Sequence, residues 1–174
     1  MNTIRIAGDP VLRVVAKDVE DIDGRLVTTC HSMIETMYEA PGIGLAATQV
    51  GIQKNFFVYD DDGESKVILN PKLVESSGSW DYEEGCLSIP GIYLNLTRPK
   101  KVTITGLDID GKEITIEADE LLARLFQHEL DHLNGVLMLD HLESGEQDMQ
   151  WNEFNKLKES GKIVTAKKGA TPFD

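Results

Sequence analysis

Two histidines four residues apart constrain this chain more than any other feature of its sequence. His128 and His132 are the first and last residues of the segment HELDH at 128–132, and Glu129 directly follows His128. Residues four apart lie one turn above each other on one face of a helix, so both imidazoles can bind a single metal ion. The carboxylate of Glu129 can then act on a water at that metal. We therefore expect a fold in which one helix presents this face to a third ligand.

The segment around the histidines carries the signals of a helix. Asp119 is a predicted N-cap, and Asn134-Gly135 is a predicted stop. Between these ends, apolar side chains recur at helical spacing and are expected to face the core: Leu121, Leu122, Leu125 and Phe126. This context favours a metal site over the alternative, two histidines on a helix surface.

Two further helices are predicted in the first quarter of the chain. Asp9 and Pro10 form a helix start, and we expect this short helix to end near Lys17. A longer amphipathic helix is predicted over 24–38, where apolar residues follow one another at three- and four-residue steps, and Pro41-Gly42 ends it.

Two hairpins are predicted between the helices. Segments 55–59 and 66–70 read as strands joined by an acidic turn. Segments 102–107 and 113–117 read as strands joined at Asp110-Gly111, a strong two-residue turn signal. We expect a single α+β domain with antiparallel or mixed strands packed around the helix that bears the histidines.

The C-terminal part is predicted to be a helix followed by a tail. Ser144 and Gln147 form a predicted capping box. The helix over 144–160 is expected to hold three apolar side chains, Trp151, Phe154 and Leu157. From Gly161 onward this periodicity is lost, so 161–174 reads as a loose tail.

Length and charge limit the classes of protein to which the chain can belong. Its 174 residues suit one domain, and the formal net charge of -13 disfavours binding to nucleic acid or to an anionic membrane. No stretch approaches the ~20 apolar residues of a membrane span, and the first residues are not followed by an apolar signal core. We expect a cytoplasmic protein in which at least one of the two cysteines is free.

A metal site needs a third ligand, for which several side chains are candidates: Cys86, Cys30, His31, His141 and many carboxylates. Cys30 lies on the apolar stripe of the 24–38 helix and fits a buried structural cysteine, whereas His31 falls off that stripe. Cys86 follows a glycine in a stretch without periodicity, where a thiol has no obvious packing role. Two imidazoles and one thiolate would leave the fourth tetrahedral position open, as catalytic zinc sites do.

A run of small residues at 42–49, GIGLAATQ, ends in one long amide, Gln49. Small residues allow unusual backbone angles and close approach of the chain to another group. Taken alone, the run is also typical of a tight loop between a helix and a strand, with Gln49 as an ordinary surface or capping side chain.

Three stretches together resemble the signature of the peptide deformylase family. They follow in the order GIGLAATQ at 42–49, EGCLS at 84–88 and QHELDH at 127–132. Enzymes of this family remove the formyl group from the N-terminal N-formylmethionine of newly made polypeptides. The resemblance implies a metal-dependent deformylase domain at 1–143, with the helix 144–160 packed on the same domain.

The resemblance also implies the metal and its ligands. Cys86, His128 and His132 would hold one divalent metal ion per chain. In the family this is Fe(II) natively, with zinc, nickel or cobalt often found instead. Glu84 and Arg98 match positions that pair and brace the cysteine loop, although a surface charge remains the alternative for Arg98.

The catalytic and substrate-binding residues follow from the same resemblance. Glu129 would serve as general base and then as general acid. The side-chain amide of Gln49 and the backbone N–H of Leu87 would stabilise the charge that develops on the formyl oxygen. The methionine side chain would occupy a pocket lined by Ile43, Gly44, Tyr82, Leu121 and Leu125.

The resemblance implies N-formylmethionyl nascent peptides as partners. It also implies that the protein is a monomer that associates transiently with the ribosome. The mixed charge of the 144–160 helix argues against direct contact with ribosomal RNA. Two alternatives share His128, Glu129 and His132: a zinc peptidase that cleaves internal peptide bonds, and a metal-binding homologue without catalytic activity.

Overall fold

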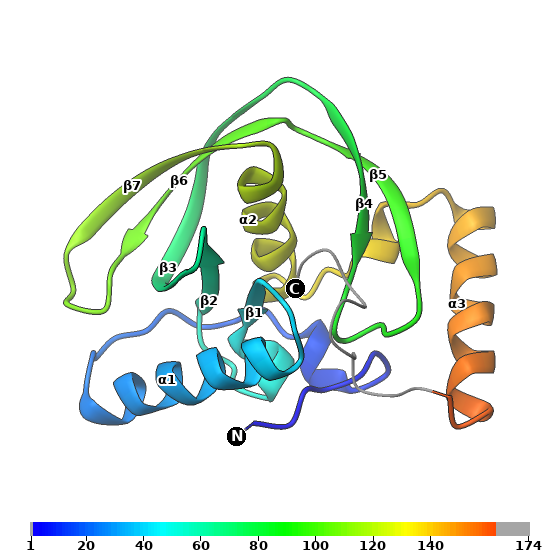
Figure 1. Cartoon of the computed structure of the whole chain (residues 1–174), viewed down its shortest axis with the longest axis horizontal. Coiled ribbons are helices and arrows are strands. Elements are labelled where there is room, and N and C mark those ends of the chain that lie inside the picture. The colour runs from blue at the N-terminus through cyan, green and yellow to red at the C-terminus, as the bar shows by residue number, and fades with distance from the viewer. Residues whose placement is uncertain (1, 163–174) are drawn as a thin grey trace.

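The computed structural model describes residues 2–162 and places two antiparallel sheets on either side of one helix, α2 (Figure 1). The five strands of the larger sheet follow in the order β1 (Gly44–Ala46), β2 (Phe56–Asp61), β3 (Glu64–Ser77), β6 (Lys101–Leu107) and β7 (Glu113–Asp119). The smaller sheet pairs β4 (Trp80–Gly85) with β5 (Tyr93–Arg98). The helices in this part of the chain are α1 (Gly24–Glu39), α2 (Glu120–Leu133) and α3 (Ser144–Glu159), with short 3₁₀ helices η1 (Pro10–Arg13), η2 (Ala47–Val50) and η3 (Met138–His141).

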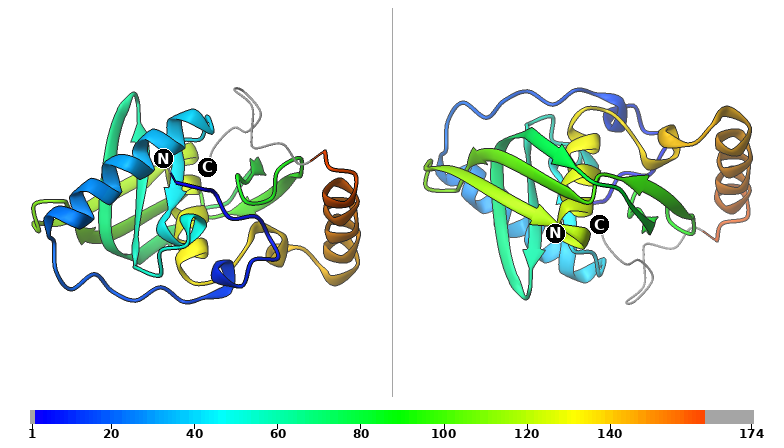
Figure 2. Two further views of the ribbon diagram at one scale, coloured as in Figure 1. Left: turned by 90° about the horizontal axis from the view of Figure 1, so that it is seen from below. Right: turned by 90° about the horizontal axis from the view of Figure 1, so that it is seen from above.

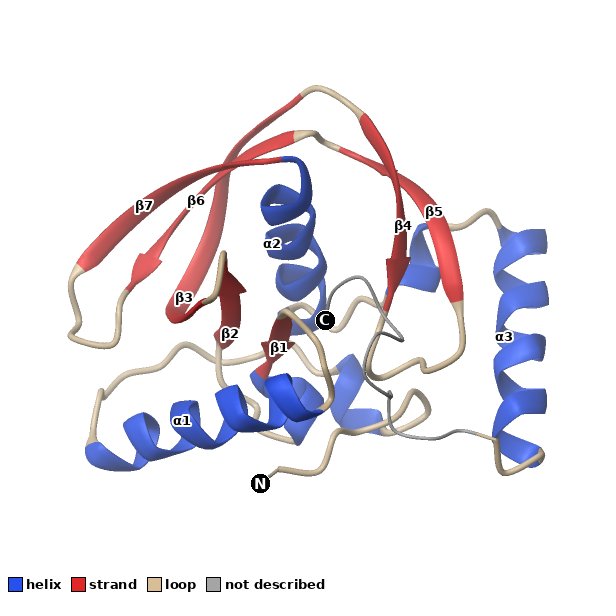
Figure 3. Ribbon diagram, viewed as in Figure 1, coloured by secondary structure: helices blue, strands red, loops and turns tan. Residues whose placement is uncertain are grey.

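The side chains of β2 point alternately toward two helices. Phe57 and Tyr59 belong to the apolar cluster that includes Phe126 of α2, and the rings of Tyr59 and Phe126 meet edge-on with centroids 5.1 Å apart. Phe56 and Val58 belong to a different cluster, which the apolar stripe of α1 completes. Because alternate residues of a strand lie on opposite faces, α1 and α2 cover opposite faces of the five-stranded sheet (Figure 3).

Helix α3 lies beside β5, on the side away from the five-stranded sheet (Figure 2). Phe154 anchors it, since this side chain is buried in a cluster with Leu12 of η1 and Leu94 of β5. Trp151 and Leu157 pack against the same cluster, so the three apolar residues expected in this helix are the ones that attach it.

The main elements predicted from the sequence are confirmed. The helix predicted for 24–38 spans Gly24–Glu39, and both predicted hairpins are present. The helix with the histidines ends at Leu133 with Asn134 as its C-cap, and Gly135 follows in the left-handed region with φ 72°. The fold class is α+β, as expected.

Three details of the predicted helix ends are wrong. The first helix is a 3₁₀ turn that stops at Arg13, and Lys17 instead forms a bridge with Lys54. Asp119 occupies the N-cap of α2, but its side chain makes no capping hydrogen bond. The capping box of α3 is absent because Glu143 is the N-cap, and the side chain of Gln147 donates to the carbonyl of Leu139.

Several strands were not anticipated. The run at 42–49 is not a simple loop, since it contains β1 and η2. The strand predicted at 66–70 continues to Ser77, and β4 and β5 lie in a segment for which no strand was predicted.

The predicted tail, 161–174, falls almost entirely outside the described residues, which end at 162. Among residues 2–162, the structure contains no helix with the length and apolar character needed to cross a bilayer.

Candidate active site

His128 and His132 lie on one face of α2 and point to the same place. Their Nε2 atoms are 3.2 Å apart, and both side chains are buried. The four-residue spacing creates this approach, because it stacks the two imidazoles one turn apart along the helix.

Cys86 supplies a thiol to the same point from the residue that follows β4. Its Sγ atom lies 3.4 Å from Nε2 of His132, and the ligand atoms of Cys86, His128 and His132 all lie within 4.8 Å of one another. Tetrahedral coordination at roughly 2.0–2.1 Å to nitrogen and about 2.3 Å to sulfur would place the donors roughly 3.3–3.6 Å apart. The observed separations fit one metal ion held by all three side chains.

The other candidate ligands lie elsewhere. Cys30 is buried in the α1 cluster, and this burial raises the pKa of its thiol to about 11. His31 is exposed on α1, as expected from its place off the apolar stripe. His141 belongs to η3 and contacts Asp131, with Nε2 2.7 Å from Oδ2.

Glu84 orients the first histidine. Its Oε1 atom lies 2.9 Å from Nδ1 of His128, and a carboxylate at that distance accepts a hydrogen bond from Nδ1–H and leaves Nε2 available to a metal. Two N–H groups of Arg98 donate to the same carboxylate. Nε lies 2.5 Å from Oε2, and Nη2 lies 2.9 Å from Oε1. Both residues are buried, so the alternative of a surface charge at Arg98 is wrong and the expected pair is present.

Burial alone would raise the pKa of the Glu84 carboxyl. The hydrogen bonds from His128 and Arg98, together with their charges, outweigh burial and hold this pKa well below its usual range. Glu84 is therefore ionised at neutral pH and acts as an acceptor for all of its partners.

Gln49 is fully buried at the end of η2, and its amide is fixed at both ends. Its Oε1 atom accepts from the backbone N–H of Ala46 at 2.9 Å, while Nε2 donates to Oγ of Ser88 at 3.2 Å. Nε2 also lies 4.0 Å from Sγ of Cys86. Gln49 is therefore not a surface side chain, and its N–H groups face the thiol.

Glu129 lies against the Gly-rich run. A Cβ atom added to Gly44 would be 2.7 Å from Oε1 of Glu129, closer than side chains approach one another. Gly44 and Glu129 are both buried, and Glu129 follows His128 directly in α2. The absence of a side chain at Gly44 therefore makes room for this carboxylate.

The predicted pocket residues come from three elements. Ile43 packs against the cluster that contains Leu125, which is completely buried. Tyr82 is half-buried on β4, and Leu121 is 36% exposed at the start of α2. Leu87, whose backbone N–H is the predicted donor to the formyl oxygen and not part of the pocket, is buried next to Cys86. The binding of a substrate by these residues stays a prediction.

Sequence reasoning missed two charged residues of the site. Asp131 accepts from Nη1 of Arg98 at 2.9 Å, and Arg124 donates from Nη1 to Oε2 of Glu84 at 2.6 Å. Burial raises the pKa of Asp131, but the hydrogen bond from His141 and the charge of Arg98 outweigh it and keep this pKa below its usual value. A signal for Arg124 was available, because it precedes His128 by four residues on the predicted helix.

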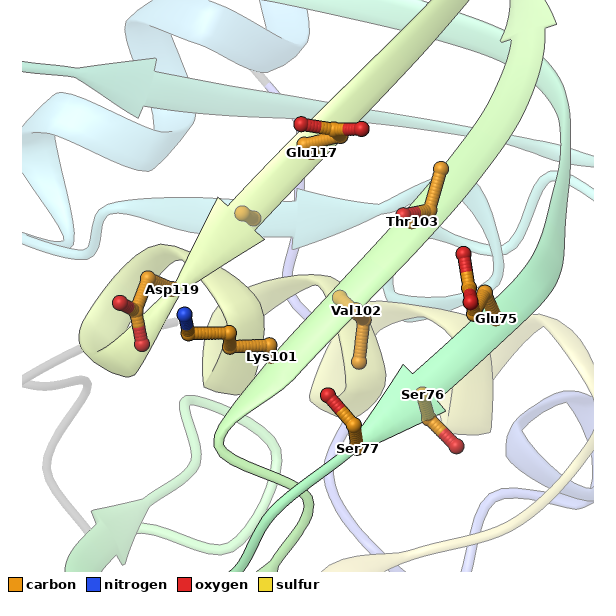
Figure 4. A pocket seen from close by; sticks show the side chains of 9 residues that line it. Glu75, Ser76, Ser77, Lys101, Val102, Thr103, Glu117 and Asp119 are labelled. Atoms are coloured by element: carbon orange, nitrogen blue, oxygen red, sulfur yellow. The ribbon is translucent and has the colours of Figure 1, made fainter.

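A cavity of about 340 Å³ lies away from this site, on the exposed face of β3, β6 and β7 (Figure 4). The strand register places Thr103 between Glu75 and Glu117, and Lys101 between Ser77 and Asp119. None of the predicted site residues lines it.

The chain is similar in sequence and in structure to proteins of one known family. The sequence model of the family described as polypeptide deformylase matches residues 1–148. A peptide deformylase of Rhizobium meliloti (strain 1021) is 48% identical over 157 residues, which cover 87% of this chain and 90% of the relative. A peptide deformylase of Acidothermus cellulolyticus is 41% identical over 169 residues, which cover 97% of this chain and 94% of the relative.

The solved structures lead to the same family. A crystal structure of a peptide deformylase from Legionella pneumophila matches with a TM-score of 0.88 and 41% sequence identity, covering 94% of this chain and 99% of that chain. These matches favour the deformylase prediction over the peptidase and the non-catalytic alternative. The chain belongs to the peptide deformylase family.

Proposed function

We propose that this protein hydrolyses the formyl amide of N-formylmethionyl peptides and so frees the N-terminal amine of newly made polypeptides. One observation carries the proposal beyond family membership. A cysteine and two histidines converge within 4.8 Å, with a glutamate of the same helix and a fixed glutamine amide beside them. Ligands, base and amide donor are the parts that hydrolysis of a small amide requires.

Cys86, His128 and His132 would hold one divalent metal ion, with Fe(II) proposed as the native ion and zinc, nickel or cobalt as substitutes. When bound, this ion supplies Lewis acidity and lowers the pKa of a coordinated water toward neutrality. The thiolate makes an iron-loaded site sensitive to oxidation, so the protein is to be purified without oxygen.

Glu129 would move the protons of the reaction. Its carboxylate takes a proton from the attacking water as the new C–O bond forms at the formyl carbon. When the C–N bond breaks, the same proton passes to the nitrogen of the leaving methionine amine. The products are a free amine and formic acid, which loses its proton at neutral pH to give formate, and Glu129 returns to its ionised form.

Gln49 and Leu87 would stabilise the oxygen of the formyl group as negative charge develops on it. The Ala46 N–H group holds the Gln49 amide in one orientation, so its Nε2 donors are in place before the substrate arrives. Loss of a single donor of this kind lowers kcat by roughly 10²–10³-fold in other hydrolases.

The methionine side chain would lie in an apolar pocket formed by residues of the Gly-rich run, β4 and α2: Ile43, Gly44, Tyr82, Leu121 and Leu125. We propose residues 1–143 as the catalytic unit, with the helix 144–160 packed on it. We further propose a monomer in the cytoplasm that meets nascent chains during transient ribosome association, without binding nucleic acid specifically.

The test offers the anaerobically purified protein two substrates, formyl-Met-Ala-Ser and an unformylated peptide with internal peptide bonds. We expect formate and new amine in equal amounts from the first and no new amine from the second. New amines from the internal peptide, without formate from the formylated one, would contradict the proposal.

A further inference from the structure

Glu84 has two arginine partners, and the sequence led us to expect only Arg98. Nη1 of Arg124 lies 2.6 Å from Oε2 of Glu84, and Oε1 of the same carboxylate lies 2.9 Å from Nδ1 of His128. We propose that Arg124 is a positioning residue, which fixes the Glu84 carboxylate and thereby aims Nε2 of His128 at the metal. This inference deepens the proposed function and rests on it.

The guanidinium of Arg124 is itself held in place by β4. The side chain is only 1% exposed, and Nη2 donates to the carbonyl oxygen of Trp80. The guanidinium carbon lies 5.4 Å from the centroid of the Trp80 ring and 5.9 Å from that of Tyr82, two rings that stack at 4.6 Å. These contacts are within the range of cation–π attraction.

Arg124 therefore connects the two elements that carry the metal ligands. It lies one turn before His128 on α2, and it grips the strand whose end leads directly to Cys86. A change at Arg124 is therefore expected to alter the position of Cys86, which follows β4, relative to the two histidines on α2.

The carboxylates and arginines next to His128 are equal in number only when Arg124 is included. Arg98 bonds both Glu84 and Asp131, so two carboxylates face two arginines in this network. Without Arg124, Glu84 would keep Arg98 and His128 but lose one of its two arginines, and a buried carboxylate that has lost a charged partner is unfavourable.

The two ends of the network differ in their access to water. The side chain of Asp131 is 24% exposed and, with Arg98 and His141, lines a cavity of about 650 Å³. Arg124 lies at the shielded end. Water can replace a lost hydrogen bond at Asp131, but the structure leaves little access for it at Arg124.

The test measures Co(II) binding by the purified chain and by Arg124→Met, which keeps an unbranched stem and removes the guanidinium. Titration with the metal alone, in competition with a chelator, gives the affinity. We expect affinity to fall by about tenfold to a hundredfold, the usual effect of losing a partner that orients a ligand. The visible spectrum of thiolate-bound Co(II) should change as well, and kcat should fall while KM stays constant.

Arg25→Met is the matched control, because it makes the same change at an exposed position of α1. It should keep the affinity, spectrum and kcat of the unmodified chain. Arg124→Lys is the second variant and covers the case in which Arg124→Met does not fold. It keeps the charge but lacks the planar fork, so it should fold and lose about tenfold in Co(II) affinity.

Unchanged Co(II) affinity and spectrum in either folded Arg124 variant would overturn the inference. If the unmodified chain bound Co(II) without a thiolate band, the proposed metal site would be wrong, and the role of Arg124 with it. A loss of Co(II) affinity that is confined to the Arg124 variants supports the inference. If these variants keep their affinity, only the inference fails and the proposed function is unaffected.

Discussion

Gly44 is the residue at which the smallest change should have a large catalytic effect. The Cβ of an alanine there would lie 2.7 Å from Oε1, 3.1 Å from Cδ and 3.2 Å from Cγ of Glu129. The Glu129 carboxylate must then move, and misplacement of a reacting group by about 1 Å can cost ~10²-fold in rate. We expect Gly44→Ala to lower kcat by about a hundredfold while the bound metal, measured by elemental analysis, stays at one ion per chain.

Gly145→Ala provides the control for Gly44→Ala, because nothing lies within 4 Å of the added Cβ. It should leave kcat unchanged. A Gly44→Ala protein with the kcat of the unmodified chain would mean that Glu129 does not need its present position.

Helix spacing predicted two of the ligands, and the family resemblance predicted the third ligand and the Glu84–Arg98 pair behind them, but nothing predicted Arg124. His128 and His132 follow from helix periodicity, and Cys86 was identified through a motif. The role of Arg124 was not predicted because a charged residue on a helix is usually exposed to solvent. Only the approach of β4 to α2 shows that this one is buried on Glu84.

At the scale of elements, the end of α2 depends on a glycine for two reasons. Gly135 has φ 72°, and a Cβ there would lie 2.6 Å from the backbone oxygen of Arg13. Left-handed strain in a residue with a side chain costs about 1–3 kcal/mol, and the clash with Arg13 adds to it. Gly135→Ala should therefore lower the free energy of unfolding by more than about 1 kcal/mol, measured by urea denaturation.

Gly161 offers a matched comparison for Gly135. It follows the C-cap of α3 with φ 67°, but nothing lies within 4 Å of an added Cβ. Gly161→Ala should show only the cost of the backbone angle. Equal losses in the two variants would contradict a separate effect of the Arg13 contact.

Elements with strong local signals were predicted, and elements defined by distant partners were not. Helix α1 and the two hairpins have clear periodicity or turn residues within their own segments. Strand β1 has only three residues and no alternating pattern of its own, and it is a strand because it pairs with β2. The last part of β3 pairs with β6, about 30 residues further along the chain.

At the scale of the whole molecule, the site exists only when three distant segments meet. The carbonyl of His132 accepts from Oγ1 of Thr48 at 3.1 Å, and Gln49 donates to Ser88, so the Gly-rich run is tied to α2 and to the cysteine loop. Helix α2 can serve as the common support because it lies between the two sheets (Figure 1). The fold thus brings the carboxylate of Glu129 and the side-chain amide of Gln49 to the cluster of Cys86 and the two histidines.

In the proposed function, Glu129 moves the protons at a metal held by Cys86, His128 and His132. The most direct measurement compares Glu129→Gln with the unmodified chain in metal content and in formate release from formyl-Met-Ala-Ser. Glutamine has nearly the same shape and cannot take up the proton, and proton transfer of this kind contributes roughly 10²–10⁴-fold. Glu153→Gln, at an exposed position of α3, is the control and should leave both quantities unchanged. We expect one metal ion per chain and at least a hundredfold slower formate release for Glu129→Gln. A variant that releases formate at the unmodified rate would show that Glu129 does not move the protons.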